Sequence, residues 1–217
     1  ERLDNLKQHP LPYTYQKPEE WWRELQRATE ADFDTSPVTA VTSEKLSHCF
    51  KSIMTLPEGF KPIRKVEKLL ADKIKLFETE QKIDWATGEL LAYASICEQG
   101  YEVRMSGQDV RRGTFSHRHA ILRDEETDAY YNRLANLGED QGEFRIYNSL
   151  LSEYAVLGFE YGYAMANPHA LVLWEAQFGD FVNGAQTMID QFISGAEQKW
   201  HRMNGLTLLL PHGYEGQ

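Results

Sequence analysis

The chain has 217 residues, 41% of them hydrophobic and 12% aromatic, which is enough for one large domain or a domain with an appendage. Its 23 Lys and Arg against 33 Asp and Glu give a formal net charge of −10, so we expect no nucleic-acid partner. No apolar run approaches the roughly 20 residues that cross a bilayer, and the N-terminus lacks an apolar signal core. We therefore expect a soluble, intracellular protein with no membrane partner. Cys49 and Cys97 are too few for a disulfide framework or a thiolate metal site.

The first 62 residues differ from the rest of the chain. Three prolines interrupt the opening stretch: Pro10, Pro12 and Pro18. Residues 18–32, PEEWWRELQRATEAD, begin with a proline and an acidic turn, which predicts a short surface helix. Residues 42–57, TSEKLSHCFKSIMTLP, have a Thr/Ser cap and a helical apolar stripe that ends at Pro57. We assign residues 1–62 to an N-terminal linker and helical segment.

From residue 63 onwards, helix-like and strand-like patterns alternate. Helical patterns cover residues 66–77, 84–100, 152–166 and part of 182–200, and strand-like patterns cover 101–107, 144–149, 170–175 and 206–210. Residues 123–143 are acidic without clear periodicity, so we expect a solvated excursion there. Short apolar strands between helices predict an α/β fold, a three-layer sandwich whose central sheet is mostly parallel. In such sheets, functional sites gather at the carboxyl ends of the strands.

Histidines mark two loops that follow predicted strands. In GTFSHRHA, an extended backbone would place His117 and His119 on one face, as some zinc sites require. No third ligand stands at a recognisable spacing, so we assign no metal site and interpret both as polar residues of a loop or an active site. His212, after the last strand, has the same standing. A surface loop rich in turn-forming residues explains the first of these segments equally well.

GDFVNG, residues 179–184, begins like the Gly-Asp-Gly sequence that binds the magnesium diphosphate of thiamin diphosphate enzymes. Phe181 stands where the second glycine belongs, and Asn204 is single and too early for the downstream asparagine. No glycine-rich phosphate loop is present either. The sequence therefore shows no diphosphate site.

Glu153 opens the predicted helix SEYAVLGFEYG, residues 152–162. If Ser152 is the cap, the carboxylate lies in the first turn, where the helix dipole stabilises it by about 0.3 to 1 kcal/mol. This capping role explains the residue without any catalysis.

Three stretches in order carry a resemblance that covers residues 80–217 most strongly: SGQDVRRGTFSHRHA, the run from LLSEYAVLGFEYG to EAQFGDFVNGAQTMIDQF, and LLLPHGYEGQ. Together they resemble the thiamin diphosphate-dependent decarboxylase component of 2-oxoglutarate dehydrogenase complexes. The resemblance implies a transketolase-like pyrimidine-binding domain over residues 63–217, truncated at its C-terminal end, without the diphosphate-binding half.

The resemblance also assigns residues. It implies that Glu153 is the catalytic glutamate, that Phe181 stacks on the cofactor ring, and that Gln177 lies near the aminopyrimidine edge. His117, His119 and His212 fall in motifs that line the entrance of the family's active site, as possible substrate or loop residues.

The implied enzyme decarboxylates 2-oxoglutarate with thiamin diphosphate and passes succinyl to lipoyl groups in the tricarboxylic acid cycle. It implies a homodimer of the intact chain, with dihydrolipoyl succinyltransferase and dihydrolipoyl dehydrogenase as partners and Mg²⁺ ligands in the missing half. The expected location is the bacterial cytoplasm or the mitochondrial matrix, and the fragment alone is expected to be inactive. Two alternatives stay open: a non-catalytic interaction or regulatory domain, and a transketolase-like sugar enzyme, against which the HRH and PHGYEGQ motifs argue.

Overall fold

The computed structural model describes residues 2–8 and 20–213, and the chain divides into two units, residues 1–38 and 39–217. The first unit contains α1 (Arg2–Gln8), α2 (Glu20–Arg23) and the 3-10 helix η1 (Glu30–Phe33). The short helix predicted within residues 18–32 is present as α2, and a separate turn follows it, η1, where Thr29 donates its backbone N–H to Asp32 Oδ2 at 2.6 Å. Pro10, Pro12 and Pro18 lie outside the described residues.

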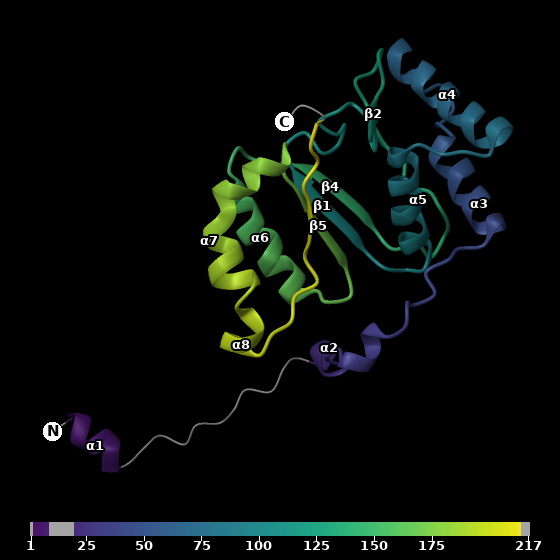
Figure 1. Ribbon diagram of the computed structural model, residues 1–217. Helices are drawn as coiled ribbons and strands as arrows, with labels where there is room; N and C mark the ends of the chain where they lie inside the picture. The colour runs from purple at the N-terminus through teal and green to yellow at the C-terminus, as the bar shows by residue number, and fades with distance from the viewer. Residues whose placement is uncertain (1, 9–19, 214–217) are drawn as a thin grey trace. The chain divides into compact units, whose positions relative to one another are not determined.

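A four-stranded parallel sheet forms the centre of the second unit (Figure 1). Its order is β4 (Phe144–Asn148), β1 (Val103–Gly107), β5 (Leu171–Glu175) and β6 (Thr207–Leu209). The two central strands, β1 and β5, are almost wholly buried, as expected for strands that helices cover on both faces. The predicted α/β class and mostly parallel central sheet are confirmed.

Three helices lie on one side of the sheet: α5 (Trp85–Glu98) packs on β1, and α3 (Ser43–Met54) and α4 (Arg64–Glu80) lie outside α5. Asp84 caps α5 by accepting the N–H of Thr87 at 2.8 Å, and Thr42 caps α3. The stripe predicted on α3 is buried, and its Phe50 stacks on Phe77 of α4 with ring centroids 3.8 Å apart. The helix α3 packs on α5 and belongs to the second unit, although it precedes residue 63. The domain boundary that we expect between residues 62 and 63 stays a prediction.

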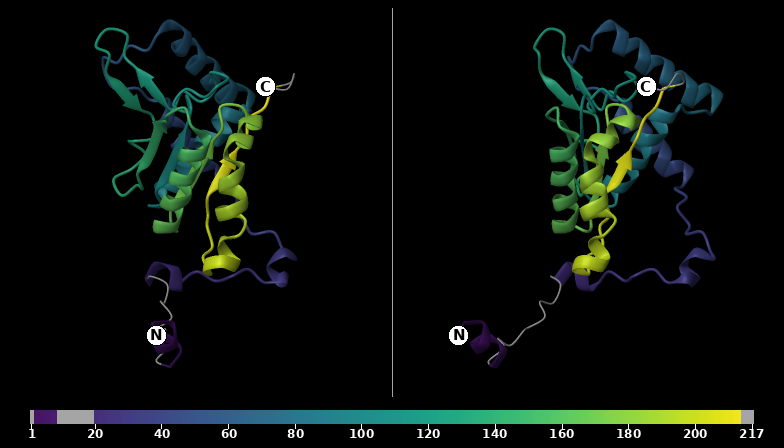
Figure 2. Two further views of the ribbon diagram at one scale, coloured as in Figure 1. Left: turned by 90° about the vertical axis from the view of Figure 1, so that its left-hand side faces the viewer. Right: turned by 60° about the vertical axis from the view of Figure 1, so that its left-hand side comes forward.

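The opposite face carries α6 (Glu153–Ala166) and an irregular helical segment, seen from two further sides in Figure 2. That segment consists of the 3-10 helix η2 (Gly179–Ala185), α7 (Gln186–Met188), the π-helix η3 (Ile189–Ile193) and α8 (Ala196–Trp200). The helix that we predict within residues 182–200 is present as the continuous helical stretch α7–η3, whose winding changes from α to π, and α8 follows after Gly195. Leu157 of α6 and Trp174 of β5 centre the small apolar cluster on this face.

The excursion expected over residues 123–143 is only partly solvated. It contains the hairpin β2 (Ile121–Arg123) and β3 (Tyr130–Asn132), and Leu134 and Arg133 are buried beyond it. Arg133 donates to Ile53 O at 2.8 Å, and burial lowers its pKa to about 10. The prediction is wrong for Arg133 and Leu134. Exposed acidic residues dominate the composition of this stretch, so its few buried residues do not form a recognisable sequence pattern.

Candidate active site

The loops that follow the strands meet at one edge of the sheet, because parallel strands all point their carboxyl ends the same way. Residues 108–120 follow β1, residues 149–152 lead from β4 into α6, and residues 176–178 lead from β5 into η2. The residues that we predict as functional lie in these loops, in the segment after β6 and at the first turns of the following helices.

Glu153 is the first residue of α6, and Ser152 caps the helix by accepting the N–H of Ala155 at 3.2 Å. Its half-buried carboxylate accepts a hydrogen bond at Oε1 from Gln108 Nε2, 2.7 Å away. Gln108 stands directly after β1, and the sequence patterns do not single it out. Its place at the carboxyl end of a predicted strand is the one signal that points to it. The cap is real, but it leaves both carboxylate oxygens for other groups.

Phe181 lies in η2, the 3-10 helix whose Gly184 is next to Glu153. It lies one turn before Gly184 in η2, and residues three apart in a 3-10 helix share a face. A Cβ built on Gly184 would lie 3.5 Å from Glu153 Oε2. The structure therefore brings Glu153 together with the helix face that carries Phe181. Phe181 is 39% exposed, so part of the residue is accessible to solvent.

Phe181 is the last of three phenylalanines whose rings contact one another in a row. Its ring meets Phe178 edge-on at 5.7 Å between centroids, and Phe178 meets Phe115 edge-on at 6.2 Å. The loops that carry these rings are also joined by a hydrogen bond at 2.8 Å from Thr114 Oγ1 to the carbonyl of Gln177. Gln177 is thus held at the site through its backbone, while the role of its amide stays a prediction.

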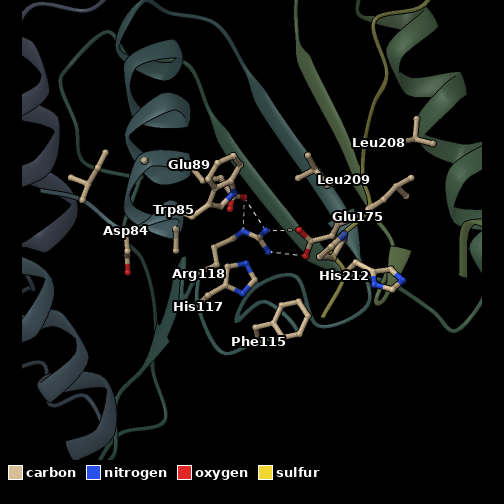
Figure 3. Close-up of a pocket in the computed structure, with 15 residues that line it drawn as sticks. Asp84, Trp85, Glu89, Phe115, His117, Arg118, Glu175, Leu208, Leu209 and His212 are labelled. Atoms are coloured by element: carbon tan, nitrogen blue, oxygen red, sulfur yellow. Dashed lines mark hydrogen bonds and ion pairs between the residues drawn. The ribbon is translucent and has the colours of Figure 1, made fainter. Parts of the chain in front are cut away.

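A separate cavity of about 930 Å³ opens on the other side of β5. It is lined by the start of α5, by Phe115, His117 and Arg118, and by residues 208–212 (Figure 3). Glu153, Gln177 and Phe181 do not line it. Since Phe115 lines the cavity and also packs on Phe178, the row of rings runs from the cavity to Phe181.

A buried ion-pair network forms one wall of this cavity. Arg118, 1% exposed, donates to Glu175 Oε1 at 2.9 Å, to Glu89 Oε1 at 2.8 Å and to the carbonyl of Val110 at 2.9 Å (Figure 3). Burial raises the pKa of Glu175, and the adjacent guanidinium opposes that shift. Burial alone would lower the pKa of Arg118, but the bonds to Glu175 and Glu89 raise it. The network ties the loop after β1 to the end of β5.

The histidines separate in the folded chain. His117 lines the cavity and His212 lies at its rim, whereas His119 does not line it. The stretch around them is not an extended strand, since Ser116 and His119 have φ of +53° and +43°. His119 Nε2 lies 3.0 Å from Ser116 Oγ. The shared face considered for His117 and His119 is therefore wrong.

Burial lowers the pKa of His117, and the charge of Arg118 lowers it further. Its ring lies against Gly113, where a Cβ would come within 2.4 Å of Cε1, and Gly113 has φ of +82°, so only glycine fits. Among the described residues, no hydrogen-bond partner reaches the buried Nδ1 of His117.

Metal ligands do not gather in the described part of the chain. Residues 2–8 and 20–213 contain no group of three or more His, Cys, Asp or Glu side chains that could hold a metal ion. No helix within them is long and apolar enough to cross a membrane. GDFVNG forms the 3-10 helix η2.

Comparison with known proteins identifies the domain. Residues 81–217 match the family model described as "Transketolase, pyrimidine binding domain". The chain is 50% identical over 196 residues to the 2-oxoglutarate dehydrogenase E1 components of Brucella anthropi, Brucella ovis and Brucella canis, covering 90% of this chain and 20% of each relative. It thus spans about a fifth of the length of the curated relatives it matches. A parallel sheet with a carboxylate and an aromatic ring at its carboxyl edge agrees with that match, and the chain belongs to the transketolase pyrimidine-binding domain family.

Proposed function

We propose that this chain is the pyrimidine-binding part of a 2-oxoglutarate dehydrogenase E1 component, which decarboxylates 2-oxoglutarate with thiamin diphosphate and passes succinyl to a lipoyl group. The observation that carries the proposal is the 50% identity over 90% of this chain to proteins of that name. The carboxylate and ring at the carboxyl edge of the sheet support it independently.

The residues present fit an aminopyrimidine ring. Such a ring is flat and aromatic with nitrogen atoms at its edge, so it suits the partly exposed Phe181 and the carboxylate of Glu153. Gly184 leaves the space beside Glu153 Oε2 without a side chain. The described residues contain no group of three or more His, Cys, Asp or Glu side chains for Mg²⁺, and the sequence shows no diphosphate motif. We therefore assign those ligands to the remainder of the longer protein.

In the proposed mechanism, the cofactor supplies an electron sink that lets a 2-oxo acid lose carbon dioxide. Glu153 holds a proton between its carboxylate and a ring nitrogen, which is general acid–base work. Phe181 packs against the ring, and Phe178 keeps Phe181 in place through their edge-on contact. Thr114 holds the backbone of Gln177 through its carbonyl, and we propose that the Gln177 amide lies near the aminopyrimidine edge.

The proposed substrate is a dianion, and the cavity offers two histidines for it. His117 aims its ring into the cavity from the loop after β1, and His212 comes from the segment after β6 (Figure 3). With its pKa lowered, His117 is neutral at pH 7 and acts through one N–H as a hydrogen-bond donor. His119, bonded to Ser116, supports the loop instead.

The wider assignments follow from the same proposal. They are a homodimer of the intact chain, assembly with dihydrolipoyl succinyltransferase and dihydrolipoyl dehydrogenase, and work in the tricarboxylic acid cycle. The proposed location is the cytoplasm of a bacterium or the mitochondrial matrix of a eukaryote.

The test uses the full-length protein that contains this chain, supplied with thiamin diphosphate, Mg²⁺ and 2-oxoglutarate. Carbon dioxide release should fall by about 10²- to 10⁴-fold in Glu153→Ala, because general acid–base catalysis contributes that much. Glu44→Ala is the matched control, since Glu44 is also an acidic residue in the first turn of a helix with a Thr cap. Normal turnover by Glu153→Ala, or turnover only with a sugar phosphate as substrate, would overturn the proposal.

A further inference from the structure

Gln108 occupies a backbone position that is tightly determined. Gly107 before it has φ of +152°, and a Cβ there would lie 2.2 Å from the carbonyl oxygen of Glu175. Only glycine permits this approach of β1 to β5. Asp109 after it has φ of +55° and pairs with Arg112. The direction in which Gln108 leaves the sheet is therefore set by the sheet and by the loop.

The two oxygens of Glu153 have different neighbours. Oε1 accepts the 2.7 Å hydrogen bond from Gln108 Nε2. Oε2 lies on the side of Gly184 in η2, where a Cβ built on that glycine would come within 3.5 Å of it. The last side-chain torsion of a glutamate is broad and turns easily, so a bond to one oxygen fixes where the other one points.

The bond to Glu153 comes from a neutral donor. The two arginines that follow Gln108 in the loop have other partners. Arg112 pairs with Asp109, and Arg111 Nε donates to Ile146 O at 3.2 Å. Within the described ranges, Glu153 makes no ion pair. A glutamine orients the carboxylate without neutralising it, whereas an arginine would hold it in a salt bridge.

We propose that Gln108 is a positioning residue that holds Glu153 Oε1 so that Oε2 faces the ring bound over Phe181. This inference rests on the proposed function and adds a residue to it. Gln108 acts through Glu153 and not on the ring itself, so it affects activation of the cofactor more than binding of cofactor or substrate.

The test compares Gln108→Met with Gln99→Met in the full-length protein. Met keeps the length of the side chain and removes its N–H donor. Gln99→Met also removes an amide hydrogen bond, the one that Gln99 Nε2 donates to Ser95 O at 2.8 Å. Gln99 lies after α5, at the opposite end of the sheet. The main readout is deuterium exchange at the reactive carbon of bound thiamin diphosphate without substrate. The second readout is the dissociation constant of the cofactor.

We expect Gln108→Met to slow the exchange by about 10- to 100-fold, the cost of a carboxylate displaced by about 1 Å. The affinity for thiamin diphosphate and the Michaelis constant for the oxo acid substrate should change less than about threefold, because neither depends on where Oε2 points. Gln99→Met should behave like the parent. If Gln108→Met does not fold, as judged by circular dichroism, Gln108→Leu tests the same loss of the donor.

A double-mutant cycle separates positioning from a general structural effect. In a Glu153→Gln background, Gln108→Met should slow the exchange no further. Effects that multiply, or a Gln108→Met that exchanges normally while Glu153→Gln is slow, would overturn this inference alone. Normal exchange in Glu153→Gln would instead overturn the proposed function.

Discussion

At the scale of single residues, Arg118 uses its guanidinium entirely for bonds within the protein, next to the candidate site. Its guanidinium bonds two carboxylates and a carbonyl while being 1% exposed. With these bonds made, it is a structural cation and not a ligand for substrate. The same loop contains three non-glycine residues with positive φ, Asp109, Ser116 and His119, which cost energy unless their surroundings impose them. Arg118 supplies that constraint.

Arg118→Met should destabilise the fold by about 3 to 5 kcal/mol, because it leaves the buried carboxylate of Glu175 without its cation. Urea unfolding followed by circular dichroism measures the change. Arg123→Met is the control, since the exposed pair of Arg123 with Asp128 contributes at most about 1 kcal/mol.

The double variant Arg118→Met/Glu175→Gln should recover part of that loss, because the uncompensated charge is gone. An Arg118→Met protein as stable as the parent would mean that the network does not hold the loop.

At the scale of elements, Asp124 joins the hairpin β2–β3 to the segment before α4. Its carboxylate accepts backbone N–H bonds from Lys61 at 2.7 Å, from Thr127 at 2.8 Å and from Glu126 at 3.0 Å. The bond from Lys61, with the turn N–H groups, lowers the pKa of Asp124 to about 2 from the usual 3.8. A depressed pKa stabilises the folded state fully above the unfolded value and no longer below the folded one.

The stabilisation by Asp124 should therefore be present above about pH 4 and disappear as the pH falls to about 2. Asp124→Asn should lower the urea midpoint at pH 7 and differ little from the parent at pH 2. Asp128→Asn serves as the control, because Asp128 lies in the same hairpin, is exposed, and has φ of +61°, which Asn tolerates. If Asp124→Asn lowered the urea midpoint equally at pH 7 and pH 2, the charge of Asp124 would not be the source of the stabilisation.

The elements that the sequence predicts well are those with local signals. Asp84 and Ser152 are caps that the residue pattern marks and that the structure confirms. The segment 182–200 is harder: only the step to α8 is marked in the sequence, by Gly195, whereas η2 and α7 pack on α6, a contact that a local pattern does not reveal. The hairpin within 123–143 escapes prediction for the same reason: its buried anchors are few and bind a helix far away in sequence.

The candidate site divides in the same way. Glu153 is explained by its cap alone, and only the resemblance points beyond that. Its hydrogen bond to Gln108 joins residues 45 apart in the chain, and Phe181 reaches it through Gly184. Such contacts depend on the order of the strands and the direction of the loops, and short sequence patterns do not predict either of them.

At the scale of the whole molecule, the limits of the folding unit differ from those of the family match. The match begins at residue 81, whereas the second unit begins at Thr39 and includes α3 and α4. Both apolar clusters draw only on residues from 46 onwards. The helices before the family match, α3 and α4, therefore contribute side chains to the larger apolar cluster, and we predict that the domain includes α3.

Two shortened chains test this view. Residues 39–217 should fold with the urea midpoint of the 217-residue chain, because no side chain of the two clusters is lost. Residues 63–217 lack α3, which buries Cys49, Phe50, Ile53 and Met54.

At about 1.5 to 3 kcal/mol for each large apolar side chain, the loss of α3 removes much of the roughly 5 to 15 kcal/mol that keeps a domain folded. Circular dichroism and limited proteolysis should therefore show residues 63–217 as largely unfolded. If both shortened chains instead unfold at the same urea concentration, α3 contributes nothing to the core. The domain would then begin where the proline-rich and helical opening of the sequence suggests, at residue 63.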